Sequence, residues 1–201
     1  KVFDVFNALF MILLMFVTLY PFVHVLFASL SEASRLVAHS GLLYKPLGLN
    51  FNAYREVLKN DMILIGYANT VFYVVVGTFV NLVMTTLGAY GISRKNLYWG
   101  KLITIIIVFT MFFGGGLIPT FLLVKSLGMY NSRWALIIPS AISTWNLLIM
   151  RTYFSSIPIS LQESAKIDGA GDFKILLRIV LPLSTPVIAV MTLFYGVAHW
   201  N

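Results

Sequence analysis

The chain has 201 residues, of which 59% are hydrophobic and 10% are charged, and its formal net charge is +7. Soluble domains hold about 45–50% apolar and about 25% charged residues, and one core of this size could not enclose so much apolar surface. The absence of cysteine excludes disulfides, thiolate catalysis and cysteine metal sites. Composition therefore favours a membrane protein, and basic residues between apolar runs suit an anionic bilayer better than nucleic acid.

Apolar runs long enough to cross a membrane follow one another along the chain. A spanning helix needs about 20 mostly apolar residues, and helices satisfy their own backbone polar groups in lipid. The first run is also longer than the core of a signal peptide, which has about 7–15 residues. We therefore expect an all-α, polytopic helical bundle in the membrane. The predicted spans are 5–30, 66–92, 102–123 and 134–150, with a fifth that begins near Leu183.

Basic residues in the connectors predict the orientation of these spans. The connector 93–101 carries three basic residues and no acidic one, which by the positive-inside rule places it in the cytoplasm. The N-terminus and the segment 151–182 then lie on the cytoplasmic side. The connectors 31–65 and 124–133 lie on the outer side.

Two local features interrupt the apolar pattern. The run Gly114-Gly115-Gly116, followed by Pro119, predicts a break or bend in a helix. The spacing of apolar residues over 51–58 predicts a short interfacial helix in the long outer connector. That connector is either a simple link or a docking surface for an external partner.

Residues 160–182, called the polar insert below, hold three of the seven acidic residues. Ser160 and Glu163 have the spacing of a capping box, and Gly169 suits the left-handed residue that closes a helix. Asp172 is placed to cap a second helix, which we expect Pro182 to end. The apolar face predicted for that helix consists of Phe173, Leu176, Leu177 and Val180.

The polar insert is thus predicted to be two short helices joined at a glycine, lying on the inner membrane surface. Its small residues Ser164 and Ala165 would allow another backbone to approach closely. The residues alone leave two alternatives open. One is an interfacial loop with ordinary caps, and the other is a helix that seats in a groove of a cytosolic partner.

The stretch ESAKIDGAGDFKILLRIVLP resembles the EAA loop of binding-protein-dependent ABC transporter permeases of the MetI-like superfamily. That pattern is E-A-A-x-x-D-G-A with I-x-L-P further on, and Ser164 stands where alanine is frequent, a small-for-small change. The resemblance implies that these positions couple the chain to an ATPase. The matching residues are Glu163, Ser164, Ala165, Asp168, Gly169, Ala170, Ile179, Leu181 and Pro182.

Further segments, among them LLIMRTYFSSIP and FYGVAHWN, are similar to the carbohydrate-uptake branch of that superfamily, in particular to maltose-permease-like subunits that serve oligosaccharide import. Members of the family normally continue into a sixth helix. Because this sequence ends at Asn201 in an apolar run, we expect a C-terminal truncation with about five of six spans present. Residues 1–201 would then be one incomplete permease domain that includes the cytoplasmic coupling loop 160–182.

The resemblance implies a permease subunit that forms the translocation pathway for a sugar or oligosaccharide in the cytoplasmic membrane of a bacterium. It implies no enzyme activity and no cofactor on this chain, since ATP and Mg bind to the partner. The implied partners are a second, different permease subunit, two ATP-binding cassette subunits, an extracellular sugar-binding protein and membrane lipid, but no nucleic acid. Alternatives are an ABC permease for a peptide or amino acid, and a secondary transporter, although the predicted spans hold essentially no acidic groups.

Polar residues within the spans are candidates for the translocation path, because such groups face protein or a water-filled cavity. The candidates are Asn81, Thr85 and Asn146. The alternative is that they form hydrogen bonds between helices. The isolated residues His24 and His199 give no support for a metal site.

Overall fold

The computed structural model describes residues 2–200, and within them every regular element is a helix. The chain divides into two compact units, unit 1 up to Tyr67 and unit 2 from Ala68 onward. An isolated antiparallel bridge joins Ser31 and Leu49 in unit 1. The helical architecture confirms the expectation of an all-α chain.

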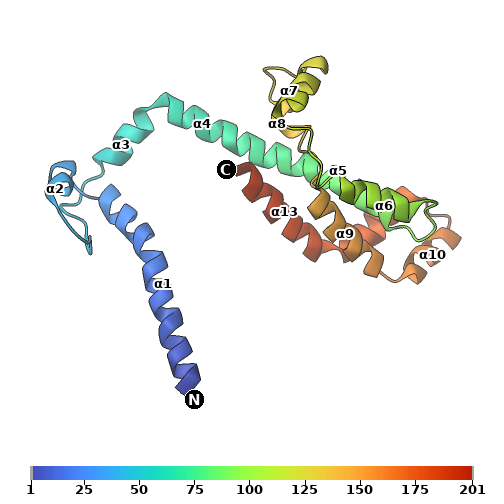
Figure 1. The fold of residues 1–201 in the computed structure, drawn as a ribbon, viewed down its shortest axis with the longest axis horizontal. Helices are drawn as coiled ribbons and strands as arrows, with labels where there is room; N and C mark the ends of the chain where they lie inside the picture. The colour runs from blue at the N-terminus through green and yellow to red at the C-terminus, as the bar shows by residue number, and fades with distance from the viewer. Residues whose placement is uncertain (1, 201) are drawn as a thin grey trace. The chain divides into compact units, whose positions relative to one another are not determined.

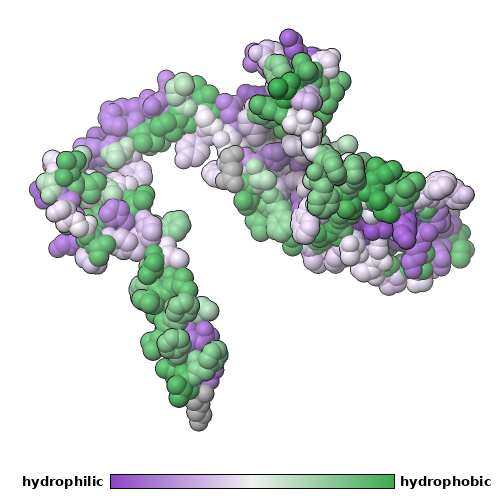
Figure 2. Space-filling model, in the orientation of Figure 1, coloured by the Kyte–Doolittle hydropathy of each residue, from purple (hydrophilic) through white to green (hydrophobic). Residues whose placement is uncertain are grey.

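Unit 1 is built on one long apolar helix. No residue of this helix, α1, is buried within the chain, and Figure 2 shows its largely hydrophobic surface. An apolar helix whose side chains are left unburied by its own chain is suited to contact lipid. The helix predicted over 51–58 is confirmed as α3. The elements are α1, Val2–Ser29; α2, Ala33–Ala38; α3, Asn52–Lys59; and the first part of α4, Asp61–Phe72.

The loop that follows α1 folds back on the end of that helix through hydrogen bonds. The Ser31 hydroxyl donates to the Phe27 carbonyl at 2.6 Å and accepts from the Leu47 amide at 2.9 Å. The Leu43 amide donates to the Tyr20 hydroxyl at 2.9 Å, and the Leu43 side chain is buried. The first bond satisfies a carbonyl in the last turn of α1, and the other two satisfy amides of the loop that would otherwise lack a partner.

Unit 2 holds the core of the molecule, where α5, α9 and α13 lie side by side (Figure 1). The core side chains include Ala89, Leu147, Met150, Phe154, Met191 and Tyr195. The elements are the π-helical turn η1, Tyr73–Gly77; α5, Thr78–Ser93; α6, Gly100–Phe109; α7, Leu117–Ser126; α8, Trp134–Ile137; α9, Thr144–Ser156; α10, Ile159–Ile167; α11, Asp172–Ile175; the π-helical turn η2, Leu176–Val180; α12, Leu181–Leu183; and α13, Thr185–Trp200.

Two predicted spans are not continuous helices. The span 102–123 is divided into α6 and α7, because the chain leaves the helix after Phe109 and re-enters it at Gly116 with a left-handed φ of +81°. The span 134–150 is divided into α8 and α9, and Ser143 caps the new helix by accepting from the Asn146 amide. Glycine allows the first break and a serine cap favours the second.

Two helices in residues 2–200 are long and apolar enough to cross a membrane: Val2–Ser29, of 28 residues, and Asp61–Ser93, of 33 residues. The second corresponds to the predicted span 66–92, with η1 within it. The pair Asp172–Leu183 and Thr185–Trp200, bent by 85°, adds a third candidate if both helices form one broken span. The predicted fifth span corresponds to the helix Thr185–Trp200, which follows the helix of the polar insert after a sharp bend.

Candidate functional site

The polar insert begins with α10, and the predicted capping box is wrong. The residue before this helix is Pro158, which makes no side-chain cap, and Ser160 already lies inside the first turn. Proline fixes φ near the helical value and has no amide to satisfy, so it can start the helix ahead of the serine. Glu163 consequently has no capping role and lies exposed on α10.

The turn after α10 confirms the predicted role of Gly169. Its φ is +77°, in the left-handed region that favours glycine. The Gly169 amide donates to the Lys166 carbonyl at 3.0 Å, and the Ala170 amide donates to the Ala165 carbonyl at 2.9 Å. The helix therefore ends in the hydrogen-bonded turn that a left-handed residue makes possible.

Asp172 has a different role from the predicted cap. The N-cap of α11 is Gly171, without a side-chain bond, and Asp172 is the first residue of the helix. Its carboxylate forms ion pairs with Arg94 and, at 3.4 Å, with the Lys166 ammonium. Because Arg94 belongs to the connector after α5, the acidic group links distant segments of the chain and not the end of its own helix.

Arg94 holds both helices of the polar insert against α5. Its guanidinium donates to the Gln162 side-chain oxygen on α10 and to the Asp172 carboxylate on α11. It also lies 4.8 Å from the centre of the Tyr90 ring, and the Tyr90 hydroxyl donates to the Asp172 carbonyl at 3.1 Å. The Arg94 side chain is only 15% exposed. A planar guanidinium with five donors suits this position, since it binds two acceptors and stacks on a ring.

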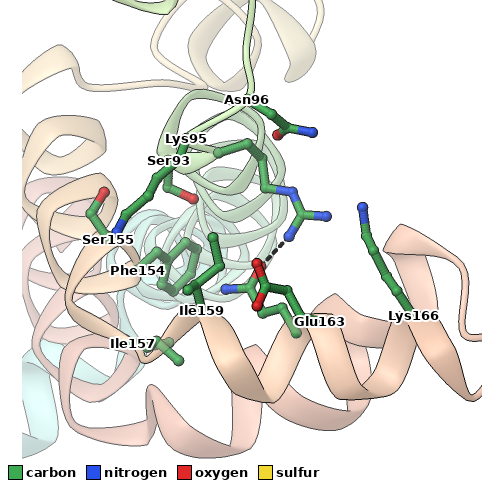
Figure 3. A pocket seen from close by; sticks show the side chains of 11 residues that line it. Ser93, Lys95, Asn96, Phe154, Ser155, Ile157, Ile159, Glu163 and Lys166 are labelled. Carbon is green, nitrogen blue, oxygen red and sulfur yellow. Dashed lines mark hydrogen bonds between the residues drawn. The ribbon is translucent and has the colours of Figure 1, made fainter.

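A cavity of about 260 Å³ lies between the connector after α5, the end of α9, and α10. Figure 3 shows Glu163 and Lys166 on α10 and Lys95 and Asn96 on the connector, with a dashed line for the hydrogen bond of Arg94. Hydrophilic surface also gathers at this end of unit 2 (Figure 2). The sequence prediction used Arg94 only as one of the basic residues that orient the spans in the membrane. A single basic residue in a short loop does not indicate which side chains it contacts.

The signature residues of the polar insert divide into two faces. One group packs against the core of unit 2 and the other is exposed. The packed residues are Ala165, Ala170, Ile179 and Leu181. The exposed residues are Glu163, Ser164, Asp168, Gly169 and Pro182. The insert therefore presents charged and small groups outward while its aliphatic groups join it to the helices behind.

The predicted apolar face of the second helix is only partly right. Leu176 and Val180 are buried together with Ile175, whereas Phe173 and Leu177 are exposed. The cause is η2, since a π-helical turn adds a residue to each turn and shifts the face that points inward. The helix consequently packs Ile175, Leu176 and Val180 on the protein core and leaves Phe173 and Leu177 on its outer side.

Pro182 does not end the helix as predicted. It lies in the first turn of α12, where a missing amide is tolerated. The chain bends instead at Ser184, between the two helices that meet at 85°. The Ser184 hydroxyl is buried and makes no hydrogen bond with the described residues.

The residues predicted to line the translocation path, Asn81, Thr85 and Asn146, lie within the core of unit 2. The Asn81 amide nitrogen donates to the Ser140 carbonyl at 3.0 Å, and its oxygen lies 3.3 Å from the His199 ring nitrogen. Asn146 is buried at the start of α9. These contacts join α5 to the break before α9 and to α13.

Thr85 belongs to a second hydrogen-bonded group in the same core. Its hydroxyl lies 2.7 Å from the Tyr195 hydroxyl, which also accepts from the Ser143 amide at 3.2 Å. Both Thr85 and Tyr195 are buried. In this conformation the polar groups of Asn81 and Thr85 therefore bond to their own chain. Residues 2–200 contain no group of three or more metal-binding side chains.

Comparison with known proteins identifies the chain. No family model matches it. It is 43% identical over all 201 residues to the polygalacturonan/rhamnogalacturonan transport system permease protein YtcP of Bacillus subtilis (strain 168), of which it covers 70%. It is 39% identical to protein LplC of the same organism, covering 68% of that protein.

A solved structure supports the same assignment. A bacterial ABC transporter involved in the import of the acidic polysaccharide alginate contains a chain that matches with a TM-score of 0.95 and 34% identity. The match covers 100% of the present chain and 71% of that one. The all-helical fold, the packed polar insert and these similarities lead to one conclusion: the chain belongs to the permease subunits of sugar and oligosaccharide ABC transporters.

Proposed function

We propose that this permease forms part of the path by which a sugar or oligosaccharide enters the cell, and that the polar insert couples it to a separate ATPase. The substrate class is supported by the relatives named above and by the galactooligosaccharide permease GanQ of Bacillus subtilis, 32% identical over 184 residues. The relatives are transport permeases, so ATP hydrolysis belongs to partner subunits and not to this chain.

The coupling role rests mainly on one observation. The polar insert exposes Glu163, Ser164 and Asp168 while Arg94 and the core side chains fasten it to α5. A force applied to the exposed side would therefore reach a membrane-spanning helix without first unfolding the insert. Small displacements of such packed elements produce rigid-body transitions between two states.

In the mechanism that we propose, the ATPase binds the exposed side of α10. Glu163 pairs with a basic side chain of that partner, and Ser164 allows its backbone to approach closely. Since part of Ala165 already packs on the core, this residue supports α10 from behind. Closure of two ATPase subunits around ATP moves the insert, and the attached helices alternate between inward- and outward-facing arrangements.

The rest of the assembly follows from the same proposal. A second permease subunit, different from this one, completes the pathway, and an extracellular sugar-binding protein delivers the substrate. The N-terminus and the polar insert face the cytoplasm of a bacterium. Asn81, Thr85 and Asn146 remain predicted path residues, which requires their hydrogen bonds to exchange for substrate or water during transport.

The coupling role is tested in the complete transporter with Glu163→Lys. Reversal of this exposed charge should abolish sugar uptake and substrate-stimulated ATPase activity while the permease remains in the membrane. Glu163→Asp is the matched control, because it keeps an exposed carboxylate at the same position of α10. Normal uptake by the Glu163→Lys variant would contradict the proposal.

The substrate class is tested by uptake of labelled oligosaccharides and labelled peptides in the same vesicles. Uptake of an oligosaccharide, with no uptake of peptides or amino acids, is the expected result. Uptake of a peptide alone would assign the permease to a different nutrient.

A further inference from the structure

A second cavity, of about 410 Å³, lies on another side of the connector after α5. It is bordered by the end of α5, the start of α6 and the end of α9. Four of its lining residues are basic and none is acidic. The basic residues are Arg94, Lys95, Lys101 and Arg151.

Most of this positive charge is not neutralised by the chain itself. Arg94 is paired with Asp172, which lies outside the cavity. Arg151 uses its Nε–H, one of five N–H donors, to bind the Ile92 carbonyl at 3.2 Å. Within residues 2–200, neither Lys95 nor Lys101 forms an ion pair, and both are exposed. The cavity thus has the charge to attract an anionic group.

One wall of the same cavity is apolar. Leu97 and Ile105 line it, and no residue of α6 is buried within the chain. Figure 2 shows the hydrophobic surface of α6 directly beside the hydrophilic end of unit 2. Tyr98 and Trp99 are exposed next to the cavity, as aromatic side chains are at the membrane–water boundary.

We propose that this cavity binds the headgroup of an anionic phospholipid, with the acyl chains lying along α6. Basic pockets at the ends of membrane helices attract anionic headgroups. A soluble phosphate would use only the cations, whereas a lipid also covers the exposed apolar residues of α6. An anionic phospholipid therefore matches both the positive charge of the cavity and the apolar surface of α6 beside it. This site does not depend on the proposed coupling function, although a bound lipid would steady the connector that carries Arg94.

The test uses the complete transporter in detergent, titrated with phosphatidylglycerol or phosphatidylcholine, with bound lipids counted by native mass spectrometry. We expect one phosphatidylglycerol site that phosphatidylcholine does not fill. Loss of each cation near an anionic surface weakens attraction about fivefold, so the double variant K95Q/K101Q should lose affinity about 25-fold. The variant K95R/K101R, which keeps both charges, should retain the site and shows that folding is intact.

The matched control is K45Q/K125Q, which removes two exposed lysines elsewhere in the chain and should leave binding unchanged. Equal loss in K45Q/K125Q would overturn the proposal, because net charge and not this cavity would govern binding. Displacement of the lipid by millimolar glycerol phosphate would also overturn it, in favour of a soluble anion. Loss of the ATPase subunit from K95Q/K101Q with unchanged lipid binding would assign the cations to a protein contact instead.

Discussion

At the scale of single residues, glycine is needed at two positions, at one for its backbone conformation and at the other for the close approach of a neighbouring helix. Gly169 has a φ of +77° in the turn of the polar insert, whereas Gly171, two residues later, has a φ of −70°. A Cβ added at either position meets no atom within 4 Å. Substitutions at these two positions therefore separate the effect of backbone conformation from the effect of steric contact with the added side chain.

The variant Gly169→Ala should destabilise the turn by about 1–2 kcal/mol, because an L-residue is strained in the left-handed region. That cost corresponds to roughly a tenfold increase in local opening. Hydrogen exchange of the Ala170 amide, which bonds to the Ala165 carbonyl, measures this opening. Gly171→Ser is the control and should leave exchange unchanged, because it adds a Cβ at a negative φ and serine is favoured at this N-cap. An equal response of both variants would refute the conformational argument.

Gly77 is required for a different reason, the close approach of α13. A Cβ at this position would lie 2.6 Å from Nε2 of His199, whereas a Cβ on Gly91, in α5, would meet nothing within 4 Å. We expect Gly77→Ala to lower the free energy of unfolding by about 1–3 kcal/mol through overpacking. Gly91→Ala should be neutral or stabilising by up to about 1 kcal/mol.

Denaturation midpoints of the two permease variants in detergent measure these changes. The addition of His199→Ala to Gly77→Ala should recover part of the loss, since it removes the ring that the new methyl group meets. If the double variant is as unstable as the sum of the two single variants, the contact is not the cause.

At the scale of elements, the sequence predicts what depends on local pattern. The apolar run of α1, the short helix α3 and the left-handed turn at Gly169 all follow from hydropathy or from one special residue. The capping residues of the polar insert do not, because Pro158 and Gly171 start the helices earlier than Ser160 and Asp172 would. Proline, glycine, serine and aspartate all suit the start of a helix, so neighbouring residues compete for such positions within one turn.

Long-range contacts account for the other differences. The π-helical turn η2 changes which residues of the second helix are buried. Its position depends on packing in the core with residues of α5 and α9, which the local sequence pattern does not encode. Arg94 likewise owes its structural role to contacts with Gln162 and Asp172, which lie 68 and 78 positions further along the chain. The polar insert could be located from the sequence, but its attachment to α5 could not.

Arg94→Gln should detach the polar insert from α5 while leaving the fold intact. The ion pair and hydrogen bonds of this largely buried guanidinium are lost together, so the Asp172 carboxylate keeps only its ion pair with Lys166. We expect hydrogen exchange in α10 to rise at least about tenfold and uptake to fall at normal permease levels. Arg133→Gln is the control, since Arg133 also binds an amide oxygen, that of Asn69, and stacks on a ring elsewhere in unit 2. Unchanged exchange in α10 would show that core packing alone holds the insert.

At the scale of the whole molecule, the chain combines lipid-facing apolar helices with one polar end in unit 2. The buried bonds of Asn81 and Thr85 fix the core that surrounds α5, and the polar insert is fastened to the end of that helix. A permease of this family depends on separate subunits for ATP hydrolysis. Its exposed side chains at the polar insert are where we propose that the partner ATPase acts.

Disulfide crosslinking in the assembled transporter tests this central claim most directly, because the 201 residues contain no cysteine of their own. Ser164→Cys on the exposed side of α10 should crosslink to cysteines introduced in the groove of the ATPase subunit, and ATP should change the yield. Ser126→Cys, an exposed serine at the end of α7, should give no such product. A Ser164→Cys permease that transports normally, stays accessible to soluble thiol reagents and never crosslinks to the ATPase would contradict the account.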